Sequence, residues 1–244
     1  MTEFKLQRIL AASLLLNLLA VVVSGCTVYH RGGWAYIRDR FTKPPALNAA
    51  LNPDDIAYLT RETLFQRLPT RPTPVVFLGD SQTANCEWGE LFAGSVNRGI
   101  GGDTSAGLLK RASEVVRLHP KAVLMLIGAN DFARGIPPDE TASNIRSTVS
   151  LLRAASPETT IFVESLLPTW FARRNLFAAS VNKFLQQLAN GKNVVYLDLY
   201  NSFLQGDLLD SKLSYDGLHL NGSGLILWKQ LLEARVAPFL PRRD

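Results

Sequence analysis

Three residues of this sequence are of the types that together perform nucleophilic catalysis. Ser81 ends the stretch "VVFLGDS", and Asp216 and His219 stand three residues apart in "YDGLH" near the C-terminus. A serine hydroxyl becomes a useful nucleophile when a neighbouring base removes its proton during attack. Histidine, with an ordinary pKa of about 6.5, suits that task, and an aspartate on its other ring nitrogen fixes the tautomer. The residue types therefore predict a group in which His219 is the base and Asp216 orients it.

Each of these segments also has a purely structural interpretation. Ser81 can cap a helix in a strand-to-helix turn, and an Asp and His pair can serve as caps as well. The glycine-rich loop "NRGIGGDTSAG", residues 97–107, can face an anion with its backbone amides, although it lacks the Gly-Lys-Ser/Thr ending of a nucleotide phosphate loop. Asn130 in "GAND" is a typical turn residue. Taken singly, these segments leave both interpretations open.

The elements around these residues decide where they lie. Apolar runs of strand length alternate with helix-like stretches. The expected strands are 74–78, 95–99, 122–128, 160–166 and 193–199, and the expected helices are 104–118, 139–155, 173–189 and 221–240. This alternation predicts an α/β fold, a three-layer α/β/α sandwich with a five-stranded parallel sheet in flavodoxin-like order. In such sheets, sites form beyond the carboxyl ends of the strands.

Four candidate residues fall in four separate loops of this predicted fold. Ser81, Gly102, Asn130 and His219 each follow a strand or precede the last helix, so they are expected at one edge of the sheet. The segments "GDS", "NRGIGGDT", "GAND" and "DGLH" resemble, in order and spacing, the SGNH hydrolases, also called GDSL-type esterases, from Val75 to Leu240. "VFLGDS" and "NRGIGGDTSAGLLKR" are most similar to the subgroup of platelet-activating-factor acetylhydrolase 1b catalytic subunits.

The resemblance implies an oxyanion hole beside the nucleophile. In it the backbone amides of Ser81 and Gly102 and the side-chain amide of Asn130 would donate to the tetrahedral intermediate. The residue types agree with this role, because glycine allows close approach of a substrate and an amide donates without carrying charge.

Further residues are expected to support or border this site. Asp80 is interpreted as bracing the turn before the serine, and Asn97 and Asp103 as holding the glycine loop. Trp170 and Phe171, in "LLPTWFARRN" after the fourth strand, are expected either to line an acyl or alcohol pocket or to pack against the domain.

The implied activity is a serine esterase that cleaves carboxylic esters through an acyl-enzyme. Short acyl groups such as acetyl are favoured because no long lid segment separates the motifs, and the alcohol is left open between a lipid and a carbohydrate. The alternatives are a lysophospholipase or thioesterase, an acyltransferase with the same triad, and a non-catalytic module that binds acylated glycans. No metal or cofactor is expected, because the sequence has no His/Cys/carboxylate cluster with ligand spacing.

The N-terminus predicts a location outside the cytoplasm. Lys5 and Arg8 precede the uncharged run "ILAASLLLNLLAVVV", which ends in Val23-Ser24-Gly25-Cys26. This segment resembles a bacterial lipoprotein signal with Cys26 as the lipidated residue; an uncleaved anchor and ordinary cleavage are the alternatives. The expected organisation is a signal peptide or membrane anchor at 1–25, a tether with a short helix at 26–73, and the hydrolase domain at 74–244.

Charge and composition exclude one class of partner. The net charge of +5 is basic, yet no cluster of lysine or arginine is interleaved with aromatic residues, so nucleic acid is not expected as a partner. A membrane surface that carries anionic lipids fits this charge better. Since Cys26 is expected to be lipidated, Cys86 is expected to be a buried free thiol.

Overall fold

The computed structural model describes residues 3–41 and 52–241, which form two compact units divided after Asn52. The first unit contains helices α1 (Glu3–His30) and α2 (Trp34–Phe41). Within α1, Leu10–His30 has a mean hydropathy of 2.1 and is long and apolar enough to cross a membrane, a test that a signal sequence also passes. Cys26 is exposed near the end of α1.

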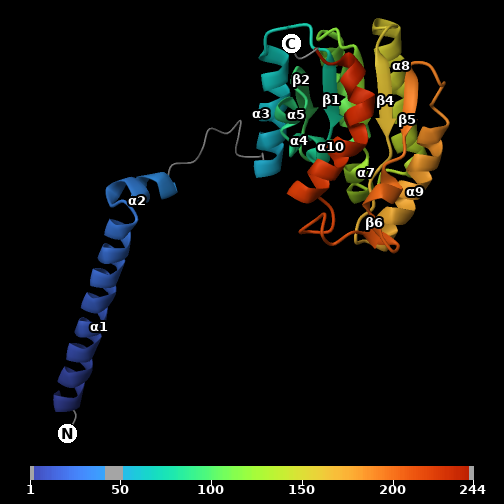
Figure 1. The fold of residues 1–244 in the computed structure, drawn as a ribbon. Helices are drawn as coiled ribbons and strands as arrows, with labels where there is room; N and C mark the ends of the chain where they lie inside the picture. Colours follow the sequence, from blue (N-terminus) through green and yellow to red (C-terminus); the bar gives the residue numbers. More distant parts are fainter. Residues whose placement is uncertain (1–2, 42–51, 242–244) are drawn as a thin grey trace. The chain divides into compact units, whose positions relative to one another are not determined.

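The second unit is built on a five-stranded parallel sheet with the order β2-β1-β3-β4-β5 (Figure 1). The strands are β1 (Val75–Gly79), β2 (Ser95–Gly99), β3 (Ala122–Leu126), β4 (Thr160–Glu164) and β5 (Val194–Leu197). This arrangement confirms the predicted α/β fold with its flavodoxin-like strand order. Because the strands are parallel, their carboxyl ends and the loops that follow them lie at one edge.

Long helices cover both faces of the sheet. They are α6 (Ser105–Val116), α8 (Pro138–Ala155) and α9 (Ala172–Gln186) on one face, and α10 (Gly222–Val236) on the other. In β1, Val75 and Phe77 belong to one hydrophobic cluster while Val76 and Leu78 belong to the other. Successive side chains of a strand point to opposite faces, so a strand buried on both faces reads as a continuous apolar run.

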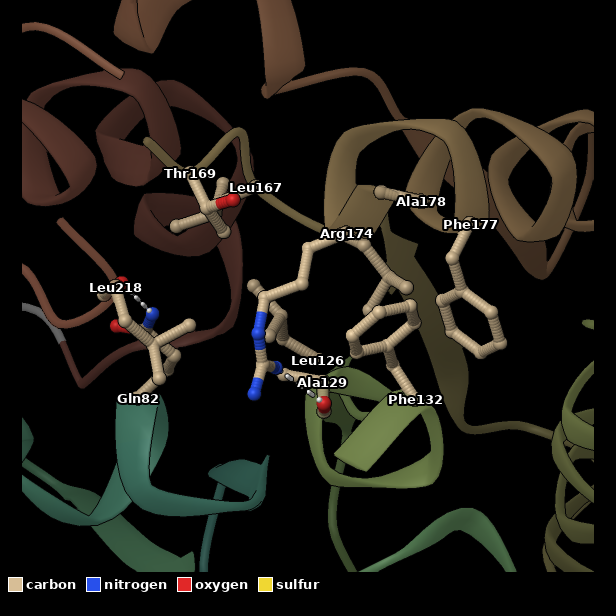
Figure 2. Close-up of a pocket in the computed structure, with 11 residues that line it drawn as sticks. Gln82, Leu126, Ala129, Phe132, Leu167, Thr169, Arg174, Phe177, Ala178 and Leu218 are labelled. Carbon is tan, nitrogen blue, oxygen red and sulfur yellow. Dashed lines mark hydrogen bonds between the residues drawn. The ribbon is translucent and has the colours of Figure 1, made fainter. Parts of the chain in front are cut away.

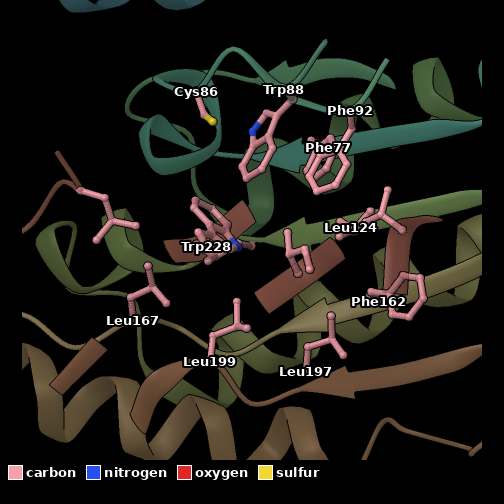
Figure 3. Packing of buried hydrophobic residues seen from close by; sticks show 14 of the residues in the cluster. Phe77, Cys86, Trp88, Phe92, Leu124, Phe162, Leu167, Leu197, Leu199 and Trp228 are labelled. Carbon is pink, nitrogen blue, oxygen red and sulfur yellow. The ribbon is translucent and has the colours of Figure 1, made fainter. Parts of the chain in front are cut away.

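The cluster on the α10 face is rich in aromatic rings (Figure 3). Phe77 stacks on Trp88 at a centroid distance of 4.0 Å, and Trp228 meets Trp88 edge-on at 4.9 Å. The Trp228 indole donates a hydrogen bond of 2.8 Å to Glu164, whose pKa is raised to about 8 by burial. The indole N–H is therefore satisfied within the core, as burial of a tryptophan requires.

Several short elements complete the unit. Before the sheet comes α3 (Pro53–Arg67), and the loops contain α4 (Ser81–Ala84), α5 (Trp88–Leu91), α7 (Ala129–Ala133), the 3-10 turns η1 (Tyr200–Phe203) and η2 (Ala237–Phe239), and a hairpin of β6 (Leu204–Gln205) and β7 (Leu208–Leu209). Among these short elements, only α3 has a run of periodic apolar residues that is long enough to predict a helix or strand from the sequence. Helices α4 and α7 each begin just beyond the carboxyl end of a central strand, where the candidate residues stand.

Candidate active site

Ser81 begins helix α4 directly beyond the end of β1. A Cβ at Gly79 would overlap the Leu126 carbonyl oxygen of the neighbouring strand, so only glycine fits the last position of β1. Asp80 then caps α4, because its Oδ1 accepts a hydrogen bond of 3.0 Å from the Gln82 backbone N–H. The turn therefore presents the Ser81 hydroxyl at the carboxyl edge of the sheet.

Ser81, His219 and Asp216 form a continuous hydrogen-bonded chain. Ser81 Oγ lies 3.0 Å from His219 Nε2, and His219 Nδ1 lies 2.7 Å from Asp216 Oδ2. The other carboxylate oxygen of Asp216 accepts from the backbone N–H groups of Leu218 (2.9 Å) and His219 (2.7 Å). The fold thus brings together a serine and a histidine that are 138 positions apart in the sequence.

The surroundings of Asp216 favour its ionised form. The slight burial of the carboxyl raises its pKa, but hydrogen bonds from the His219 ring and from the backbone N–H groups of Leu218 and His219 lower that pKa to a value well below the usual range. Asp216 is consequently a carboxylate at neutral pH. It can hold the Nδ1 proton of His219 and leave Nε2 free to accept the Ser81 proton.

Gln82 joins the Ser81 turn to the His219 loop, a role that the sequence did not suggest. Its side-chain Nε2 donates to the Leu218 carbonyl at 2.6 Å, and its Oε1 accepts from the Leu220 N–H at 3.4 Å. Gln82 is buried and is the chain neighbour of Ser81. These two bonds hold the loop that carries His219 at a set distance from Ser81.

Trp170 packs beneath the Asp216 to His219 loop. Gly217 has a φ of +75°, and a Cβ there would overlap the Trp170 ring. The Trp170 backbone N–H donates to the Gly217 carbonyl (2.9 Å), and its indole donates to the Leu209 carbonyl (3.0 Å). Phe171 is 49% exposed. Neither aromatic residue lines the apolar pocket described below, and Trp170 instead supports the loop.

The glycine loop and Asn130 lie against each other. The Asn130 side-chain Nδ2 donates to the Asp103 carbonyl at 2.9 Å, which orients the amide beside the loop. Gly102 has a φ of +75°, a conformation that favours glycine. Its carbonyl accepts a hydrogen bond of 3.3 Å from Arg134, so this oxygen already has a partner.

Asn97 connects the end of β2 to α4. Its amide Nδ2 donates to the carbonyls of Thr83 (2.9 Å) and Cys86 (2.8 Å), and its Oδ1 accepts from the Gly99 N–H (2.8 Å). A Cβ at Gly99 would overlap the backbone of Ala84 in α4. Close backbone packing therefore holds the start of the glycine loop against the Ser81 turn.

Asp103 and Arg111 form a buried ion pair beneath the glycine loop. Arg111 Nε lies 2.8 Å from Asp103 Oδ2, and both side chains are buried. The same guanidinium donates to the Arg98 carbonyl (2.8 Å) and the Gly79 carbonyl (2.9 Å). Arg111 therefore ties together the ends of β1 and β2 and the glycine loop, a role that sequence reasoning missed.

Asp80 is fully buried next to Ser81. Its Oδ2 has no hydrogen-bond partner. Burial raises the pKa of Asp80 to about 7, opposed by the hydrogen bond from Gln82 and supported by repulsion from Asp103. Asp80 is not the partner of His219 Nδ1, because that atom contacts Asp216.

An apolar pocket is lined by chain neighbours of the Ser81 and His219 pair (Figure 2). It encloses about 390 Å³, part of it open to solvent, and its walls include Gln82 and Leu218, the chain neighbours of that pair. Phe132 and Phe177 form its aromatic side. Arg174 reaches across it, donating to the Ala129 carbonyl (3.1 Å) with its guanidinium over the Phe132 ring.

The described residues, 3–41 and 52–241, contain no group of three or more His, Cys, Asp or Glu side chains placed to hold a metal ion. Within the same ranges Cys86 is a buried free thiol, and burial raises its pKa to about 12.

Comparison with known proteins relates this geometry to a family. The model of the GDSL-like lipase/acylhydrolase family matches residues 77–225. The chain is 27% identical over 161 residues to the thioesterase 1/protease 1/lysophospholipase L1 of Escherichia coli, covering 60% of this chain and 75% of that protein. A GDSL-like lipase from Bacteroides thetaiotaomicron has a TM-score of 0.60 and 26% identity, covering 75% of this chain and 98% of the other. A structure described as a platelet activating factor from Streptococcus pneumonia shares the fold, with a TM-score of 0.67 and 23% identity over 74% of this chain and 93% of the other.

Proposed function

The chain belongs to the GDSL-like lipase/acylhydrolase family and is a carboxylic ester hydrolase, and from this premise we propose that Ser81, His219 and Asp216 are its catalytic triad. The observation that carries the proposal is the chain of contacts from Ser81 Oγ to His219 Nε2 (3.0 Å) and from His219 Nδ1 to Asp216 (2.7 Å). Nucleophile and base within hydrogen-bond reach, with the base oriented by a third group, is the arrangement that activates a serine.

In the first half of the reaction, Ser81 Oγ attacks the ester carbonyl carbon while His219 Nε2 takes the hydroxyl proton. The carbonyl oxygen becomes an oxyanion, and Asp216 stabilises the imidazolium across Nδ1. When the tetrahedral intermediate collapses, the carbon–alkoxy bond breaks and His219 gives its proton to the leaving alcohol. The acyl group remains on Ser81 as an ester.

In the second half, a water molecule takes the place of the alcohol. His219 removes a proton from this water as it attacks the acyl-enzyme, and a second tetrahedral intermediate forms. Its collapse returns the proton to Ser81 and releases the carboxylic acid. The backbone N–H groups of Ser81 and Gly102 and the side chain of Asn130 would donate to the oxyanion of both intermediates.

Asn130→Ala tests the proposed oxyanion donor. We expect kcat to fall roughly 100- to 1000-fold with a smaller change in KM, because a donor aimed at developing charge contributes about 2.7 to 4 kcal/mol to the transition state. The measurement is a steady-state comparison with the unaltered chain on p-nitrophenyl acetate. A raised KM with an unchanged kcat would contradict the assignment.

We further propose that the substrates are short-acyl esters of a lipid or a carbohydrate. The support is the apolar pocket lined by Gln82, the chain neighbour of Ser81, and by Phe132 and Phe177. A second candidate is thioesterase or lysophospholipase activity, which the similarity to the Escherichia coli protein favours. The two candidates differ in the length of the acyl chain that the pocket must accommodate.

A series of esters distinguishes these candidates. The chain is assayed on p-nitrophenyl esters from acetate to palmitate and on palmitoyl-coenzyme A, with Ser81→Ala as the control. A maximum of kcat/KM at acetate or butyrate supports the short-acyl proposal. A maximum at long chains or at the thioester supports the second candidate, and activity that survives in Ser81→Ala contradicts the triad.

We also propose that the N-terminal segment places the enzyme outside the cytoplasm and that Cys26 is lipidated. The support is the apolar stretch Leu10–His30 and the small residues before Cys26. Mass spectrometry of the mature N-terminus tests this: an intact segment with an unmodified Cys26 would instead indicate an uncleaved anchor.

A further inference from the structure

Helix α3 lies outside the segment that matches the family, yet it packs against the glycine loop. The family match begins at residue 77, whereas α3 spans Pro53–Arg67. The helix lies beside the edge strand β2 (Figure 1), and its contacts with β2 and the glycine loop include those of Tyr58, Arg61 and Phe65. These contacts reach both ends of the loop that contains Gly102.

Tyr58 makes the contact at the far end of the loop. Its hydroxyl donates a hydrogen bond of 3.3 Å to Asp103 Oδ1. Burial, followed by the charge of Asp103, raises the pKa of Tyr58 to about 12, so the phenol keeps its proton and remains a donor. Gly107 leaves room for this contact, because a Cβ there would overlap the Asp103 carboxylate and lie 3.2 Å from the Tyr58 hydroxyl.

Asp103 transmits this contact to the proposed oxyanion donors. It follows Gly102 directly in the chain, and its backbone carbonyl accepts the hydrogen bond from Asn130 Nδ2 (2.9 Å). Its carboxylate is 1% exposed and also binds Arg111 (2.8 Å) and the Thr104 N–H (2.9 Å). A shift of the Asp103 main chain would therefore move both Gly102 and the Asn130 amide.

Arg61 and Phe65 secure the near end of the loop. Arg61 Nε donates to the Gly99 carbonyl at 2.5 Å. Phe65 is buried, with the guanidinium groups of Arg61 and Arg98 at 5.1 and 4.7 Å from its ring centre. Helix α3 is thereby fixed to the end of β2, which holds Tyr58 in place against Asp103.

We propose that Tyr58 is a positioning residue of this hydrolase, which acts through Asp103 to hold Gly102 and Asn130 in the geometry that binds the oxyanion. The inference rests on the proposed function, in which these two residues are the donors. If the inference holds, helix α3, which lies outside the segment that matches the family, helps to position the proposed oxyanion donors.

Tyr58→Phe in the full-length chain tests the role, since it removes the hydroxyl and keeps the ring. We expect kcat on p-nitrophenyl acetate to fall about 3- to 10-fold with KM unchanged, the size expected for one hydrogen bond that supports the transition state. Thr63→Ala is the matched control, because this exposed hydroxyl on α3 bonds only to the Leu59 and Thr60 carbonyls of its own helix. It should leave kcat unchanged.

A double-mutant cycle with Asn130→Ala separates positioning from general stability. If Tyr58 acts through the oxyanion donors, Tyr58→Phe should reduce kcat by a clearly smaller factor once the Asn130 amide is absent. The inference would be overturned if Tyr58→Phe lowered kcat by an equal factor in both backgrounds. It would also be overturned if the substitution raised KM alone, or left kcat unchanged. The proposed function is judged separately, because its failure would appear as Ser81→Ala retaining activity.

Discussion

Ser81→Ala is expected to lower kcat on p-nitrophenyl acetate by roughly 10⁴- to 10⁶-fold, the size of effect that removal of a catalytic serine produces. The variant keeps the proposed oxyanion donors and the pocket, but it has no side-chain oxygen at position 81 that can form the acyl-enzyme. His219 then has no hydroxyl to deprotonate, although its bond to Asp216 (2.7 Å) is retained. The residual rate should approach that of direct attack by water on the bound ester, assisted only by the proposed oxyanion donors and the pocket.

The measurement needs two comparisons. Ser180→Ala is the matched control, because Ser180 is exposed on α9 and bonds only to the Leu176 carbonyl one turn earlier (3.0 Å). A fluorophosphonate should label the unaltered chain and Ser180→Ala once per molecule, and mass spectrometry should locate the label on Ser81. Hydrolysis by Ser81→Ala at more than a tenth of the normal rate would show that another residue is the nucleophile.

Arg111→Ala is expected to destabilise the fold by about 3 to 5 kcal/mol, the usual cost of removing one partner of a buried ion pair. Three acceptors each lose the Arg111 donor at once: the Asp103 carboxylate and the carbonyls of Arg98 and Gly79. Asp103 is left as a buried carboxylate, which costs more than the loss of the bonds alone. The loss of activity should follow the loss of folded protein.

Urea unfolding of the full-length chain measures this effect through the shift in the transition midpoint. Lys110→Ala is the control, because Lys110 is the exposed neighbour on the same helix and its removal should change stability by less than about 0.5 kcal/mol. Arg111→Lys should recover only part of the loss, since an ammonium can pair with Asp103 but lacks the planar fork that reaches two carbonyls. A midpoint for Arg111→Ala equal to that of Lys110→Ala would show that the pair contributes nothing.

The fold followed from local patterns in the sequence. Runs such as Val75–Gly79 and Ala122–Leu126 are apolar at every position because both of their faces are covered, and this leaves a parallel sheet as the solution. The places of Ser81, Gly102 and Asn130 then followed from topology, because loops after parallel strands share one edge, and His219 was expected there because it precedes the last helix. The structure shows the contact between Ser81 and His219, while their catalytic roles remain proposals.

Other features were decided only by the tertiary structure. Whether Trp170 lines a pocket or supports the Gly217 turn depends on how the loop after β4 packs against the loop that carries His219. The pattern of apolar residues in the sequence gives no information about this packing. The bonds made by Gln82 join segments that are 136 positions apart, and those of Tyr58 join segments that are 45 apart. Local patterns were enough to predict the sheet, its carboxyl edge and the residues on that edge, because these depend on local burial and chain direction. The side chains that hold the edge in shape are polar groups whose partners are chosen by packing, so only the folded chain identifies them.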